Sequence, residues 1–115
     1  MQKVKVSDLN ALQLSDGVTA RVINSENMTI MHANLKAGHS VPEHNHIQEQ
    51  VVNVIAGEIE LIVEGKSHRL TPGEVLILSS NVPHAARAIT DCYVIDVFYP
   101  IREDLQTGFT GYSEK

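Results

Sequence analysis

The chain has 115 residues, of which 43% are apolar, and a formal net charge of −5. This length suits one folded domain with a single core, and charges spread along the chain favour a folded domain over disorder. The negative charge, with no basic cluster, argues against nucleic acid and anionic membranes as partners. A single cysteine, Cys92, excludes an internal disulfide, and no apolar span resembles a signal peptide or a membrane helix. We therefore expect a cytoplasmic protein.

Short apolar runs separated by turn residues follow one another along most of the chain. The runs that we predict as strands are residues 18–23, 28–35, 50–56, 58–63, 74–78 and 91–99. Turn residues such as Gly57, Gly65 and Pro72-Gly73 separate several of them. This regular spacing favours an all-β sandwich or barrel.

Helical periodicity is confined to residues 6–14 and 102–106, enough for a turn or two. We expect one domain over residues 1–115. Its core runs from about 18 to 104, with an N-terminal arm at 1–14 and a tail at 107–115. Because small β-sandwiches have sheet edges that a partner strand can cover, we also expect a homodimer that uses the arm.

Three histidines, His44, His46 and His84, carry the strongest chemical signal. Residues i and i+2 of an extended strand point to the same side, so His44 and His46 can face one site. A third histidine from a distant strand completes a tripod of imidazoles that binds a divalent metal ion. Three imidazoles accept zinc, nickel, iron, manganese or copper, so the sequence does not name the metal.

The residues around these histidines resemble the two motifs of the cupin superfamily. The first is Gly38-x5-His44-x-His46-x3-Gln50-x6-Gly57, and Gly73 followed by His84 echoes the second. The resemblance covers roughly residues 30–90 and implies a small double-sheet jelly-roll barrel, with one divalent metal ion in its mouth. The departures are at turn-shaping positions of the second motif: Ser79 replaces a proline, Asn81 a glycine and Ala88 an asparagine.

The resemblance also implies a fourth ligand, usually glutamate, where this chain has Gln50 preceded by Glu49. His44, His46 and Gln50 share one parity along a strand, so Gln50 is expected to face the metal and Glu49 to point away, provided that no bulge intervenes. We prefer Gln50 and leave Glu49 open. A neutral fourth ligand suits a Lewis-acid metal that polarises an anionic oxygen.

Asp96 is a carboxylate in an apolar run that we expect to be buried on both faces. Burying an unpaired charge is costly, so it needs a partner or a purpose. Two interpretations stay open: a structural ion pair with Arg87 or Arg102, or a proton-transfer group whose pKa is set by burial and by the metal. His32 falls in the middle of a predicted strand, and we expect it to be structural.

A narrower resemblance, to the pectin-degradation cupins, rests on three segments. They are Asn81-Val-Pro-His84, Asp96-x-Phe98-x-Pro100-x-Arg102-Glu-Asp104 and His44-x-His46-x2-Glu49-Gln50. That family opens 4,5-unsaturated uronate monosaccharides to linear 5-keto sugar acids. The resemblance implies metal ligands at His44, His46, Gln50 and His84. It further implies that Asp96 moves protons, that Phe98 packs against the sugar and that Arg102 grips its carboxylate, with Asp96 and Arg102 as catalytic residues.

We therefore expect a metal-dependent, isomerase-like enzyme acting on a small anionic sugar. Two alternatives remain, because cupins share one fold across many functions. One is a cupin dioxygenase that uses iron at the same ligands. The other is a cupin that binds a sugar or an effector without catalysis.

Overall fold

The computed structural model describes residues 1–105, so the tail predicted at 107–115 lies outside the described residues. These described residues form ten strands and two single 3₁₀ turns. The strands are β1 (Leu12–Ser15), β2 (Val18–Asn24), β3 (Thr29–Leu35), β4 (Ser40–His44), β5 (Glu49–Ala56), β6 (Ile59–Val63), β7 (Lys66–Leu70), β8 (Val75–Leu78), β9 (His84–Ala88) and β10 (Cys92–Tyr99). The turns are η1 (Val6–Asp8) and η2 (Glu103–Leu105). Within residues 1–105, no helix has the length and apolar character needed to cross a membrane.

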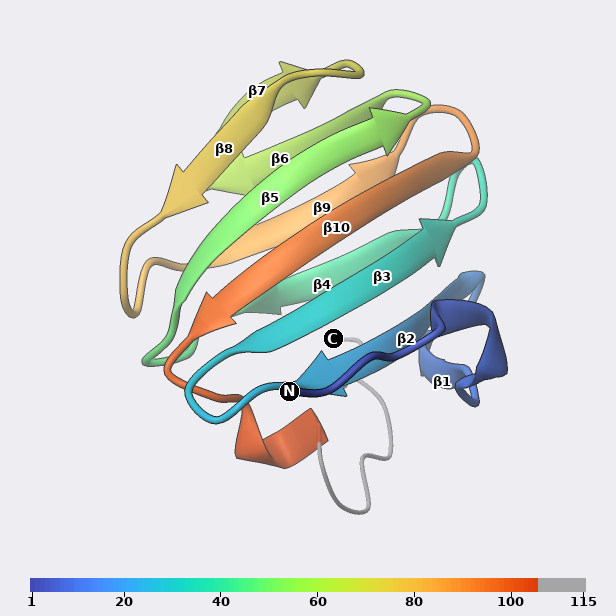
Figure 1. Cartoon of the computed structure of the whole chain (residues 1–115). Helices are drawn as coiled ribbons and strands as arrows, with labels where there is room; N and C mark the ends of the chain where they lie inside the picture. Colours follow the sequence, from blue (N-terminus) through green and yellow to red (C-terminus); the bar gives the residue numbers. More distant parts are fainter. Residues whose placement is uncertain (106–115) are drawn as a thin grey trace.

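The strands form two antiparallel sheets that face each other as two layers (Figure 1). One sheet has six strands in the order β1-β2-β3-β10-β5-β8, and the other has four in the order β4-β9-β6-β7. Some neighbouring strands are consecutive in the chain, such as β2 and β3, whereas others are far apart in sequence: β3 pairs with β10, and β4 with β9. The all-β double-sheet jelly roll predicted from the sequence is confirmed.

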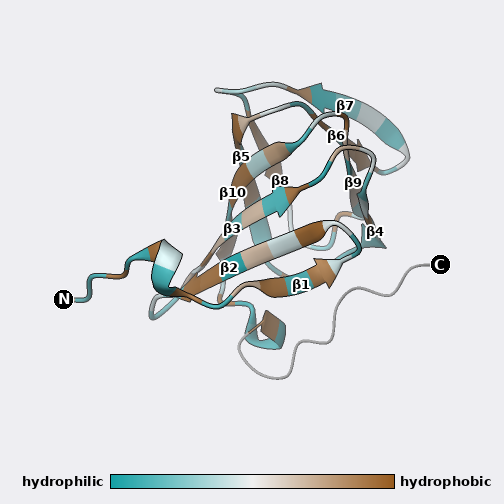
Figure 2. Cartoon of the chain, turned by 90° about the vertical axis from the view of Figure 1, so that its right-hand side faces the viewer, coloured by the Kyte–Doolittle hydropathy of each residue, from teal (hydrophilic) through white to brown (hydrophobic). Residues whose placement is uncertain are grey.

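The apolar core fills the space between the two sheets, because alternate residues of each strand point inward. Along β10 the buried residues are Cys92, Val94, Asp96 and Phe98, and the residues between them are half-buried. Figure 2 shows brown bands alternating with paler or teal ones along several strands. The burial of β10 on both faces that the sequence predicted is therefore only partial, since its outer face packs less tightly than its inner face.

Four short strands, β1, β4, β7 and β9, are absent from the runs predicted above, although β4 and β9 carry His44 and His84, which were expected on strands. Leu14 of β1 is buried in the core, so part of the segment predicted as an arm belongs to the six-stranded sheet. β4 contains Pro42 and a register shift between Val41 and His44. Proline is tolerated there because β4 is an edge strand, where a missing N–H leaves no partner strand unpaired. Such polar or proline-containing segments show little apolar alternation, which explains why they were missed.

Candidate metal centre

A cavity open to solvent lies between the two sheets, and the empty space in and at its mouth amounts to about 520 Å³. Its inner wall is apolar, with residues such as Leu14, Met31 and Leu61. Its polar lining consists of His44, Gln50, His84, Asp96 and Arg102, and Phe98 packs beside them. Because the polar groups are few and gathered together, the cavity has the character of a small-molecule site.

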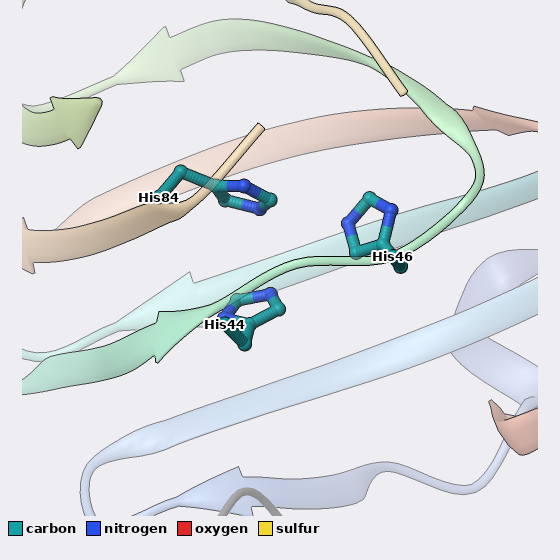
Figure 3. Close-up of side chains that lie close together, drawn as sticks. All are labelled: His44, His46 and His84. Carbon is teal, nitrogen blue, oxygen red and sulfur yellow. The ribbon is translucent and has the colours of Figure 1, made fainter. Parts of the chain in front are cut away.

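The three histidines come together from two segments of the chain. His44 is the last residue of β4 and pairs with His84, the first residue of β9, while His46 lies in the short connection between β4 and β5. Their potential ligand atoms all lie within 4.8 Å of one another, and Figure 3 shows the three rings converging. The prediction that His44 and His46 share one strand was wrong, because β4 ends at His44. The chain turns there, and that turn aims His46 at the same point.

Each of these rings is oriented by a backbone carbonyl two residues away. The Nδ1 atoms lie 2.8 Å from Pro42 O for His44, 3.0 Å from Gln48 O for His46 and 2.8 Å from Val82 O for His84. A carbonyl only accepts hydrogen bonds, so each neutral ring carries its proton on Nδ1 and keeps a lone pair on Nε2. Metal-binding histidines are typically oriented by a hydrogen bond of this kind.

One ring has a potential ligand atom that the described part of the protein leaves unsatisfied. The Nε2 atom of His84 is buried and has no hydrogen-bond partner among residues 1–105. Buried polar atoms are nearly always satisfied, and a metal ion would satisfy this one. The donor set therefore fits a divalent metal ion held by neutral imidazoles.

Asn81 ties together the two loops that carry His46 and His84. Its backbone N–H donates to His46 O at 2.8 Å, and its φ is +65°, in the left-handed region. Glycine is the usual residue in that region, and asparagine tolerates it better than most others. The substitution of asparagine for the motif glycine therefore preserves the turn before His84.

Gln50 faces the histidines from β5, and Glu49 beside it is exposed. The Oε1 atom of Gln50 lies 3.1 Å from His46 Nε2. With the His46 proton on Nδ1, both of these atoms are acceptors, an arrangement that a shared cation would stabilise. The side chain of Gln50 also hydrogen-bonds Asp96, which directs the amide group to the carboxylate and Oε1 to the histidines. The structure thus brings Gln50, rather than Glu49, to the site.

Burial sets the protonation of the site. It is the main factor that lowers the pKa of His44 to about 4, and it also lowers the pKa values of His46 and His84. The three rings are therefore neutral at neutral pH, as metal ligands must be.

The pKa of Asp96 is shifted in the opposite direction. Burial raises its pKa to about 7, although the hydrogen bond with Gln50 and the charge of Arg102 oppose the shift. Its Oδ1 atom is buried without a hydrogen-bond partner among residues 1–105. Of the two arginines considered as structural partners, Arg87 pairs with Glu60 at 3.2 Å. A carboxyl group that titrates near neutrality beside a ligand set can both take and return a proton.

Arg102 and Phe98 lie next to each other on the lining of the cavity. The Cζ atom of Arg102 lies 4.9 Å from the centroid of the Phe98 ring, and that ring lies 5.5 Å from the ring of His46. Arg102 is only 3% exposed. Its Nε donates to Asp104 Oδ1 at 3.1 Å and its Nη2 to Asp104 Oδ2 at 2.6 Å. The sequence prediction missed the pairing with Asp104, although Asp104 stands in the motif quoted above.

His32 does not belong to this site. It lies on the outer face of the six-stranded sheet, where its Nδ1 is 2.5 Å from the hydroxyl oxygen of Tyr93. Its neighbours in a shallow surface hollow include Arg21 and Asn34.

Comparison with known proteins agrees with this geometry. Residues 31–98 match the Cupin domain family. Pectin degradation protein KdgF of Dickeya dadantii (strain 3937) is 28% identical over 95 residues, which cover 80% of this chain and 86% of that protein. Dimethylsulfoniopropionate lyase DddQ of Ruegeria pomeroyi is 35% identical over 75 residues, which cover 64% of this chain but only 36% of that protein.

A solved structure shows the same fold. The structure of KdgF from Halomonas sp. superimposes with a TM-score of 0.80 at 24% identity, and the match covers 86% of this chain and 93% of that one. The predicted resemblance to cupins, and to the pectin-degradation cupins among them, is thereby confirmed. Because the family match extends over more than half of a chain that folds as two facing β-sheets, this protein belongs to the cupin family.

Proposed function

We propose that this cupin opens 4,5-unsaturated uronate monosaccharides to linear 5-keto sugar acids during the breakdown of pectin or a related polyuronate. The observation that carries the proposal is the state of Asp96. It is a buried carboxyl with a pKa of about 7, and it is hydrogen-bonded to Gln50 beside three converging histidines. The similarity to a pectin degradation protein supports the choice of substrate.

The chemistry needs one group that moves a proton between two positions. An unsaturated uronate is a cyclic hemiacetal whose ring oxygen is also part of an enol ether. Loss of the C1 hydroxyl proton forms the C1 carbonyl and breaks the bond from C1 to the ring oxygen, which becomes the oxygen of a C5 enolate. Protonation at C4 then gives the 5-keto acid, without net oxidation or reduction.

Asp96 accepts the C1 hydroxyl proton and returns it at C4. A carboxyl with a pKa near the working pH suits both steps. A divalent metal ion held by His44, His46, His84 and Gln50 would supply Lewis-acid stabilisation of the negative charge that develops on oxygen. Zinc, nickel, iron and manganese all suit such ligands.

Arg102 and Phe98 position the sugar in this proposal. The planar guanidinium of Arg102 donates parallel hydrogen bonds to a carboxylate, which the ammonium group of lysine does not reproduce. The Phe98 ring provides a flat apolar surface for the sugar. Both residues line the same cavity as Asp96.

The direct test follows the absorbance of the 4,5 double bond. Metal-loaded protein is expected to accelerate its loss beyond the spontaneous rate, while Asp96→Asn and Arg102→Ala retain metal and lose most turnover. Arg87→Ala is the matched control, because Arg87 pairs with Glu60 away from the cavity. Wild-type protein that holds one equivalent of metal but gives only the spontaneous rate would contradict the proposal.

The same preparations test the other functions. Oxygen uptake by iron-loaded protein with a small carbonyl acid would select a dioxygenase. Tight uronate binding without turnover would select a binding protein. Consumption of dimethylsulfoniopropionate would select a lyase, a candidate favoured by the relative that is 35% identical.

We also propose that the protein is a cytoplasmic homodimer. The end strand β1, which overlaps the predicted arm, is one support, and the exposed Ile55, Val75 and Ile77 on β5 and β8 are another. Light scattering after size exclusion tests this for the wild type, for a deletion of residues 1–11 and for Ile77→Lys. Dissociation in one variant identifies the surface, and a monomeric wild type contradicts the dimer.

A further inference from the structure

The backbone that carries Arg102 to the cavity is held at two adjacent residues. Ile101 O accepts a hydrogen bond from Gln48 Nε2 at 3.1 Å, and Arg102 N–H donates to Thr29 Oγ1 at 2.8 Å. Both anchoring side chains are buried, and Thr29 Oγ1 lies 2.6 Å from Asn24 Oδ1. The backbone position from which the Arg102 side chain extends is therefore fixed by contacts between distant parts of the chain.

These anchors do not determine the plane of the guanidinium, because several rotatable bonds separate it from the backbone. Asp104 does determine it. Its two oxygens accept from Nε and Nη2, and the Phe98 ring lies against the same group. All five N–H donors of a guanidinium lie in one plane, so the paired hydrogen bonds with Asp104 set the direction of the others as well.

We propose that Asp104 is a positioning residue: it holds the guanidinium of Arg102 in the plane needed to select substrates with a free carboxylate over their neutral esters. This inference rests on the proposed function only in assuming that Arg102 contacts the substrate's carboxylate. Asp104 suits the role because its side chain is about half exposed, 52%, while that of Arg102 is 4% exposed. The aspartate thus lies outside the lining of the cavity, which it leaves to the arginine.

If only charge mattered, removing the carboxylate of Asp104 would strengthen the binding of an anionic substrate, whereas lost positioning would weaken it. The charge of Arg102 reaches the histidines, where it contributes to lowering the pKa values of His44, His46 and His84. Replacing Asp104 with a neutral residue leaves that positive charge less compensated, and this strengthens the attraction for an anion. Weaker binding of a carboxylate after the substitution therefore indicates lost positioning rather than lost charge.

The test compares Asp104→Asn with Glu103→Gln in the metal-loaded, full-length protein. Glu103 is the matched control, because it is exposed, lies in the same turn η2 and undergoes the same change of charge. Each variant is assayed with the unsaturated uronate and with its methyl ester. We expect Asp104→Asn to raise KM for the acid about tenfold, the effect of losing roughly one charge-assisted hydrogen bond, and to change KM for the ester less than about twofold. Asp104→Glu should restore part of the preference for the acid.

Three results would overturn the inference: an unchanged or lowered KM for the acid in Asp104→Asn, an equal loss for acid and ester, or the same loss in Glu103→Gln. If the wild type shows no turnover, the proposed function fails by itself. The comparison is then made by calorimetric binding of galacturonate and its methyl ester. Weakening of the acid alone in Asp104→Asn supports the inference, and absence of any wild-type preference for the acid overturns it.

Discussion

Gln50 connects the ligand set to Asp96. Its side chain is hydrogen-bonded to the Asp96 carboxyl, and its Oε1 lies 3.1 Å from His46 Nε2. One neutral amide thus presents its oxygen to the histidine cluster and donates a hydrogen bond to a buried carboxyl. This arrangement explains why glutamine, rather than glutamate, suits position 50.

Gln50→Glu should keep the metal and lose activity. A carboxylate is a good metal ligand, but it places a second acid against Asp96 and removes the amide donor, so the pKa of Asp96 rises further. We expect kcat/KM at neutral pH to fall about tenfold or more, with metal content unchanged by elemental analysis. Glu49→Gln is the control and should retain both metal and activity. Loss of metal from Glu49→Gln would instead make Glu49 the ligand.

Asp96→Asn should stabilise the metal-free fold at high pH. The pKa of Asp96 is about 7 in the folded state and 3.8 as the ordinary value, so folding favours the protonated form. The stability that this group contributes is fully present below pH 3.8 and is lost as the pH rises through 7. At pH 8 the folded wild type therefore buries a charged carboxylate, which destabilises it relative to Asp96→Asn. Urea unfolding should show Asp96→Asn to be more stable at pH 8 by roughly 1 kcal/mol or more, with the difference shrinking towards pH 4. A stability difference that does not change with pH would show that the ionisation of Asp96 is not its cause.

Turnover should rise with pH over the range in which Asp96 ionises. The carboxylate form accepts the proton, and positive charge at the ligand set lowers its pKa below the value of about 7 that it has without metal. The acid limb of kcat/KM should therefore have its midpoint between 3.8 and 7. Residual activity of Asp96→Asn should lack this limb. A wild-type profile that is flat from pH 5 to 8 would remove Asp96 from the proton transfer.

The metal-free protein should lose stability through His44 as the pH falls. The pKa of His44 is lowered from 6.5 to about 4, so the unfolded chain binds a proton more readily between these values. Its contribution to stability is complete above pH 6.5 and is lost as the pH falls through 4. Thermal unfolding of chelator-treated His44→Gln should therefore depend less steeply on pH in this range than that of the wild type. His68→Gln, in β7 and outside the cluster of three histidines, serves as the control.

Local pattern was enough to predict the all-β class and to single out the histidines, while the resemblance to cupins implied the jelly roll and the fourth ligand. Apolar alternation and glycine or proline turns specify strands and their inner faces, because side-chain direction in a strand depends only on the position within it. Thus residues 28–35 and 91–99 were expected as strands, and β3 and β10 lie there. The spacing of His44, His46 and His84, together with the cupin motifs around them, likewise indicated a candidate metal site, and the three side chains do lie together.

Contacts between segments far apart in sequence set side-chain orientations and protonation states that no local pattern specifies. His46 reaches the site through a turn rather than through strand parity, and Asn81 holds that turn against the loop before His84. The anchor of Arg102 on Thr29 joins residues 73 apart in sequence. The raised pKa of Asp96 likewise depends on its burial between the two sheets. Sequence spacing specifies which residue types are available, but contacts between distant segments, and the loss of water that accompanies them, set their orientation and protonation.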